Sequence, residues 1–128
     1  MSTPANLLGL YLHLAAASHR RGQPHVRDRL LILAGTIAAR MELPDVDAHC
    51  RRIVLAHNPQ HLIKRWTTLA AALEDDEFLF FHKQLQRRYP QEKAEQMLLG
   101  LGLDMAHERD AFASDAEYAA SLLAVWGA

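Results

Sequence analysis

The chain has 128 residues, of which 50% are hydrophobic and 23% are charged, and its formal net charge is −1. This length is enough for one ordinary domain with its own core and is short for two, so we expect a single domain over residues 1–128. The near-neutral charge argues against a dedicated binder of nucleic acid, and one cysteine excludes an intramolecular disulfide framework and is typical of a reducing compartment.

Alanine and leucine dominate the composition. Each occurs 21 times, whereas valine, isoleucine and threonine together occur 12 times. Alanine and leucine are strong helix formers, while β-branched residues favour strands, and no segment shows the alternation of a strand. The sequence therefore predicts an all-α fold, a compact bundle of six or seven short antiparallel helices.

The first predicted helix covers about residues 4–21. Thr3 can cap its N-terminus, Pro4 suits its first position, and Gly22 follows the cationic last turn. Leucines surround this helix, so we expect other elements to cover it on several sides. Its apolar run, residues 7–17, is too short to cross a bilayer and lacks the preceding positive charge of a secretory signal. We therefore expect no membrane partner and a cytoplasmic location.

A second helix is predicted from Pro24 to about Met41, because Pro44 biases Leu43 away from helical angles. The stretch 45–73 then predicts a helical hairpin, two amphipathic helices that fold back at the dipeptide Asn58-Pro59. In that turn the asparagine can cap the second helix and the proline suits its first position. We expect the inward face to carry Val46, Cys50, Ile53, Val54, His57, Leu62, Ile63, Trp66, Leu69, Ala70 and Leu73.

The outer face of this hairpin is polar and mostly cationic. A helix N-terminus beside it also favours anions, so the surface suits an anionic partner. A solvated helix face has the same composition, and this is the plainer interpretation. The candidate residues for binding a partner or an anion are Arg51, Arg52, Gln60, His61, Lys64 and Arg65.

The next predicted helix, about residues 76–89, follows an acidic run at 74–77. We interpret that run as a turn and an acidic first helical turn, because it lacks the spacing and the glycine of a calcium loop. Phe80 points away from the apolar stripe and lies beside Arg87 and Arg88, so these three residues are further candidates for partner binding. In small helical domains another helix more often covers such an aromatic residue, and we expect Phe80 to be covered.

The C-terminal third contains two clear helix boundaries. A helix beginning at Pro90 should end in the Gly-Leu-Gly-Leu sequence at 100–103, which suits a left-handed C-cap with a trailing hydrophobic contact. Residues 104–112 are expected to form a short helix capped by Asp104. A capping box at 114–117 then opens a last helix, whose inward residues should be Tyr118, Leu122, Val125 and Trp126.

No motif for catalysis, a cofactor or a metal stands out. Metal sites need three or four converging ligands, and although His57 and His61 have a suitable spacing, they straddle the hairpin turn and should point apart. Cys50 lies on an apolar stripe, so we expect a small buried hydrophobe rather than a reactive thiol. We expect no catalytic residue, no cofactor and no metal; eight histidines could instead make the surface sensitive to pH.

Charge is divided unevenly along the chain. Residues 1–65 carry a formal charge of +5 and residues 66–128 carry −6. Such asymmetry hints at a charged interface, although two halves of one bundle can also pair with each other. We therefore expect a non-catalytic protein-interaction or regulatory module, and the simplest partner is a second copy, which would form a homodimer. The alternative is a nucleic-acid-binding protein that uses the basic hairpin 45–73 as a helix-turn-helix.

Overall fold

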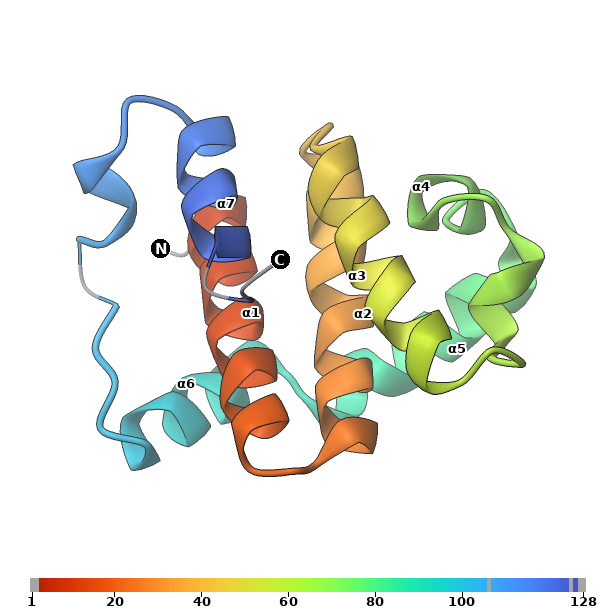
Figure 1. Ribbon diagram of the computed structural model, residues 1–128, viewed down its shortest axis with the longest axis horizontal. Helices are drawn as coiled ribbons and strands as arrows, with labels where there is room; N and C mark the ends of the chain where they lie inside the picture. Colours follow the sequence, from red (N-terminus) through yellow and green to blue (C-terminus); the bar gives the residue numbers. More distant parts are fainter. Residues whose placement is uncertain (1–2, 106, 125, 127–128) are drawn as a thin grey trace.

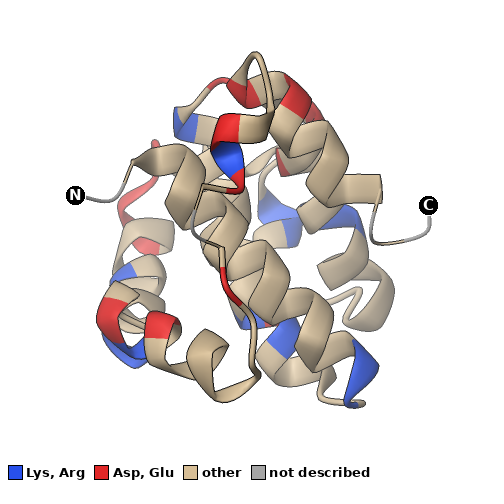
Figure 2. Ribbon diagram, turned by 90° about the vertical axis from the view of Figure 1, so that its left-hand side faces the viewer, with Lys and Arg blue, Asp and Glu red and all other residues tan. Residues whose placement is uncertain are grey.

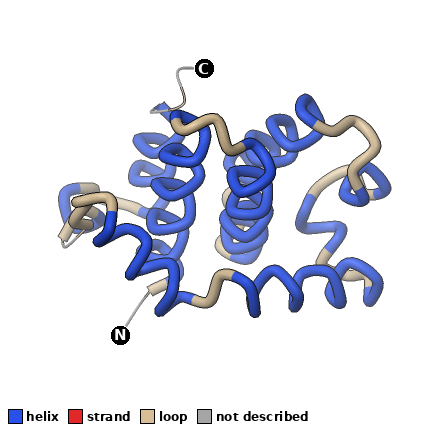
Figure 3. Tube along the Cα trace, turned by 90° about the horizontal axis from the view of Figure 1, so that it is seen from below, coloured by secondary structure: helices blue, strands red, loops and turns tan. Residues whose placement is uncertain are grey.

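A computed structural model describes residues 3–105, 107–124 and 126 of the chain. Within this part the fold is all helical and contains no strand, as predicted (Figures 1 and 3). The elements in chain order are α1 (Pro4–Arg20), α2 (Pro24–Arg40), α3 (Pro44–His57), the 3₁₀ segment η1 (Leu62–Arg65), α4 (Leu69–Ala72), α5 (Asp76–Arg88), α6 (Gln91–Gly100), the 3₁₀ segment η2 (Arg109–Ala111) and α7 (Asp115–Ala124).

Helices α1 and α2 form the centre of the molecule. They lie side by side and antiparallel, with α6 and α7 against α1 and with α3, α4 and α5 against α2 (Figure 1). Leu8, Leu12 and Leu14 of α1 and Leu30 and Leu31 of α2 are all buried in one continuous hydrophobic cluster. The expectation that the first helix is covered on several sides is therefore confirmed.

The helix boundaries follow local rules at most junctions. The Thr3 side chain accepts a hydrogen bond from the Asn6 backbone N–H at 3.2 Å, and proline occupies the first turn of α1, α2 and α3. Gly22 has a φ of 69°, which places it in the left-handed region just beyond α1. These are the boundaries that the sequence predicts.

The predicted second helix of the hairpin is wrong. Residues 59–73 form η1, an extended connection at Trp66, and the single turn α4. A continuous helix would join the Trp66 carbonyl to the Ala70 N–H, but side chains of α3 take both groups. The Arg51 Nε donates to the Trp66 carbonyl at 3.0 Å, and the carboxylate of buried Asp47 accepts from the N–H groups of Leu69 and Ala70 at 2.8 and 3.0 Å.

The predicted short helix at 104–112 is also wrong. His107 has a φ of 65°, a left-handed conformation that interrupts a helix, and only η2 forms beyond it. The capping box does form, since the Glu117 N–H donates to the Ser114 hydroxyl at 3.2 Å. The Glu117 carboxylate accepts a hydrogen bond from the Ala113 N–H at 3.1 Å. In the standard capping box the donor is the N–H of the N-cap residue, which here is Ser114.

The inward residues of α7 are mostly as predicted. Tyr118 and Leu122 are buried, and Trp126 is half-buried beyond the end of the helix. Val125 lies outside the described residues. None of the described helices is both long enough and apolar enough to cross a membrane.

Candidate functional site

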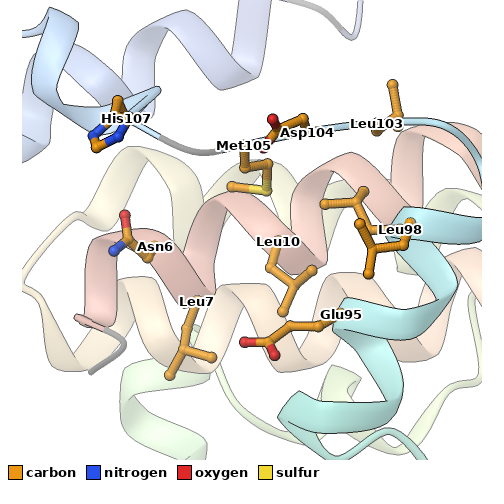
Figure 4. Close-up of a pocket in the computed structure, with 10 residues that line it drawn as sticks. Asn6, Leu7, Leu10, Glu95, Leu98, Leu103, Asp104, Met105 and His107 are labelled. Carbon is orange, nitrogen blue, oxygen red and sulfur yellow. The ribbon is translucent and has the colours of Figure 1, made fainter.

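A groove between α1, α6 and the segment that follows α6 is the main candidate site (Figure 4). Its cavity volume is about 320 Å³, at the lower end of the range for small-ligand sites. Figure 2 looks onto this side of the molecule. The residues that line the groove are Asn6, Leu7, Leu10, Glu95, Leu98, Leu99, Leu103, Asp104, Met105 and His107.

The end of α6 directs the chain back along α1 and so creates the groove. The Leu103 N–H donates to the Leu98 carbonyl at 3.2 Å and the Gly102 N–H to the Leu99 carbonyl at 2.9 Å, the two hydrogen bonds of a Schellman motif. Gly102 has a φ of 73°, which glycine adopts without strain. The predicted left-handed C-cap is confirmed, and it positions Leu103 as part of the groove lining.

The far end of this segment is anchored to α1 and α7. The Glu108 carboxylate lies 2.8 Å from the Nε2 of His13 and accepts a hydrogen bond from the Tyr118 hydroxyl at 3.1 Å. Burial, and then the neighbouring Glu108, raise the pKa of Tyr118, so the phenol stays protonated. Met105 reaches across to Gly9, where a side chain would have no room. The segment that follows α6, which forms one wall of the groove, is therefore held at both of its ends.

The groove combines an apolar floor with an anionic rim. Leucine and methionine side chains supply the floor, and Glu95 and Asp104 supply two carboxylates. The described lining residues include His107 but no lysine or arginine. Burial raises the pKa of Tyr11, whose hydroxyl donates to the Tyr89 carbonyl at 2.7 Å, and the negative charge of Glu95 raises it further. Leu99 at the groove is 71% exposed. The arrangement suits an apolar group that carries a positive charge.

The groove was not predicted from the sequence. Its residues come from α1, α6, 103–105 and His107, and no local motif shows that these segments meet. The one feature of the sequence that pointed to the groove was Leu99, a large apolar residue that falls outside the inward apolar stripe of its helix.

The basic residues of the predicted hairpin are largely bonded within the chain. Arg51 donates to the Trp66 carbonyl, Arg52 lies 3.0 Å from the Nδ1 of His49, and Arg65 pairs with Glu77 at 2.6 Å. Gln60, His61, Lys64 and Arg65 do lie together, around an open depression at η1. Their role in binding stays a prediction, but the helix that would read nucleic acid in a helix-turn-helix does not form.

The remaining predicted residues lie on a different surface, on α5. Phe80 is 68% exposed, so the expectation that another helix covers it is wrong. Arg87 and Arg88 are exposed on the same helix. Helix α5 does contact η1, since Glu77 pairs with Arg65 at 2.6 Å and the ring of Phe81 lies 5.7 Å from that of His61.

The structure also settles the positions of His57 and Cys50. His57 is exposed rather than inward, and its Nδ1 lies 2.6 Å from the Asp28 carboxylate, which Arg27 also contacts at 3.0 Å. Cys50 is fully buried, as predicted, and burial raises the pKa of its thiol. Among the residues described here, no three histidine, cysteine or carboxylate side chains are grouped so that they could hold a metal ion.

In comparisons with known proteins, no family model, no curated protein and no solved structure gives a significant match to this chain.

Proposed function

We propose that this protein is a non-catalytic interaction module whose groove at α1 and α6 binds a segment of a partner protein. The segment presents an apolar side chain next to a positive charge. The observation that carries the proposal is the composition of the groove: an apolar floor, the carboxylates of Glu95 and Asp104, and no lining lysine or arginine.

The two parts of the groove contribute differently to binding. Removal of one large apolar side chain from water on the floor contributes about 1.5–3 kcal/mol. An ion pair with Glu95, which is exposed, contributes about 0–1 kcal/mol. The floor thus supplies most of the affinity, while the rim selects the sign of the ligand's charge.

The fixed wall supports this proposal. A groove that is formed before binding requires little ordering of the protein when the partner arrives. The Schellman turn at Gly102 and the hydrogen bonds of Glu108 to His13 and Tyr118 hold the segment that forms the wall. Cys50 is sealed in the core, which agrees with a role that needs no reactive thiol.

The test is a titration with small blocked peptides, followed by the NMR signals of methyl groups. Acetyl-Phe-Arg-amide is the probe, acetyl-Phe-citrulline-amide is its neutral counterpart, and acetyl-Phe-Glu-amide is its anionic counterpart. The arginine probe should shift the methyl signals of Met105 and Leu98 and bind more tightly than the citrulline probe, with the glutamate probe weakest. The expected difference between the first two is about threefold, the size of an exposed ion pair.

Matched variants show whether the rim causes this order. The double change Glu95→Gln and Asp104→Asn should abolish the preference for arginine over citrulline, while Glu92→Gln, an exposed position on α6 outside the groove, should leave it intact. Equal binding of the arginine and glutamate probes by the wild-type protein would overturn the proposal, as would shifts confined to residues of η1.

A further inference from the structure

Two large apolar side chains are exposed among the residues that the structure describes, Phe80 at 68% and Leu99 at 71%. Leu99 lies at the groove, and Phe80 lies on α5. Exposed apolar residues flanked by polar ones are typical of interaction sites. The chain therefore has one such residue on each of two different surfaces.

The surface around Phe80 carries charges of both signs, with its cations toward the C-terminal end of α5. Lys83 and Arg87 follow Phe80 at i+3 and i+7 in α5, so all three side chains share one helix face, which we name the α5 face. Both cations are exposed, and neither forms an ion pair within the described part of the chain. Asp76 and Glu77, at i−4 and i−3 from Phe80, are exposed as well, and Glu77 pairs with Arg65. The α5 face, taken from Phe80 to Arg87, thus presents an aromatic side chain with positive charge on its C-terminal side.

We propose that the partner segment is the α5 face of a second copy of this chain, with Phe80 seated in the groove and Arg87 near Glu95. The proposal rests on the proposed function of the groove and names its occupant. The chemistry matches in both parts: a phenylalanine ring, whose burial removes about 150–250 Å² from water, meets the leucine floor, and the cations meet the anionic rim.

A single chain cannot make this contact with itself. Helices α5 and α6 follow one another along one side of the molecule, with α6 running away from the end of α5 (Figures 1 and 3). The lining of the groove includes residues of α6 but none of α5. Only Tyr89 and Pro90 separate the end of α5 from the start of α6. The Tyr89 carbonyl accepts a buried hydrogen bond from the Tyr11 hydroxyl at 2.7 Å, which holds this junction against α1. The same placement lets two copies exchange α5 faces, each entering the groove of the other, as in a two-fold pair.

Charge exchange tests the proposal in the full-length protein. One variant carries Lys83→Glu and Arg87→Glu, which makes the α5 face acidic. The other carries Glu95→Lys and Asp104→Lys, which makes the groove basic. Each variant alone brings like charges together at both contacts, whereas a mixture of the two restores opposite charges at both. Sedimentation velocity at low salt follows the oligomer, and circular dichroism confirms that every variant is folded.

The wild-type protein should self-associate at low salt and dissociate as salt screens the charges. Each charge variant should be monomeric, and the mixture should associate within about threefold of the wild-type affinity. Phe80→Ser should weaken association about tenfold or more, since it removes the aromatic anchor. Lys64→Glu, a single charge reversal of the same kind on η1, should have no effect.

Failure of this proposal is distinct from failure of the groove as a binding site. A wild-type protein that stays monomeric, or a mixture that does not recover association, overturns the self-association while the arginine probe still binds in the groove. If the arginine probe does not bind either, the proposed function fails as well. If the wild-type protein associates but the Lys64→Glu variant does not, the contact lies at η1 and the assignment to α5 is wrong.

Discussion

The Nε2 of His82 on α5 lies 2.9 Å from the hydroxyl of Thr36 on α2, and both side chains are buried. The hydroxyl already donates to the Leu33 carbonyl at 2.9 Å. It must therefore accept from His82, so Nε2 carries a hydrogen. This hydrogen bond fixes α5, and with it the α5 face, against the central helix α2.

The first prediction concerns pH. Burial, and then the nearby Arg40, lower the pKa of His82 to about 4 from the ordinary value of about 6.5. Between these values the unfolded chain binds more protons than the folded one, so the free energy of unfolding falls as the pH falls from about 6.5 to 4. The expected loss is about 3 kcal/mol, measured by urea unfolding across this range.

The variant His82→Gln separates this effect from other titrating groups. It keeps a side-chain donor but does not titrate, so its unfolding free energy should depend less steeply on pH over this range. His107→Asn, at an exposed histidine with left-handed φ that asparagine tolerates, is the matched control and should retain the wild-type slope. An unchanged slope in His82→Gln would show that other groups cause the acid sensitivity.

The second prediction concerns the packing of α7 on α1. A methyl group at Gly9 would overlap the hydroxyl of buried Tyr118 and lie 2.6 Å from the Met105 methyl. Gly9→Ala should therefore destabilise the protein by about 1–3 kcal/mol in thermal unfolding. Gly100→Ala, where nothing lies within 4 Å, should be neutral or stabilising by up to about 1 kcal/mol.

A second variant locates the cause of this loss. Adding Tyr118→Phe removes the hydroxyl and should recover part of the stability that Gly9→Ala loses. A Gly9→Ala protein as stable as the wild type would mean that α7 does not approach α1 this closely.

The third prediction concerns Asp47, whose carboxylate caps α4. Its two oxygens accept hydrogen bonds from the backbone N–H groups of Leu69 and Ala70. Removal of the carboxylate takes away the acceptor of both N–H groups. Asp47→Ala should cost about 2–3 kcal/mol, and Asp47→Asn less, because the amide keeps one acceptor. Asp45→Ala, at an exposed position in the same first turn, serves as the control; a similar loss in both variants would remove the special role of Asp47.

The sequence alone was sufficient where local rules decide the structure. The start of α1 depends on Thr3 and Pro4, and the end of α6 depends on Gly102, which adopts a left-handed conformation without strain. Each of these signals lies within a few residues of the boundary that it sets. The helical fold class followed in the same way, from residue preferences and spacing.

The sequence was insufficient where distant side chains compete for the backbone. The stretch 59–73 has a helical apolar pattern, yet Arg51 and Asp47 take the carbonyl and N–H groups that a continuous helix needs. The groove was missed for a related reason. It forms only because the segment after Gly102 returns along α1, and the Glu108 contacts that hold this segment join residues far apart in the sequence.

Exposure of Phe80 was also decided by tertiary structure. Its helical position placed it outward, but whether a neighbour covers it depends on how α5 is placed against α2. In the structure Phe80 is 68% exposed. Because the side chain is accessible, we propose it as the anchor of the interface.

The most direct test of this account is an intermolecular nuclear Overhauser effect between copies of the protein. Protein with ¹³C-labelled methionine and leucine methyl groups is mixed with unlabelled protein, and isotope filtering retains only contacts between the two. We expect cross-peaks from the Phe80 ring of the unlabelled copy to the methyl groups of Met105 and Leu99, and their loss when the unlabelled copy carries Phe80→Ser. Cross-peaks to Met41 or Met97 instead, or none in a sample that has self-associated, would contradict it.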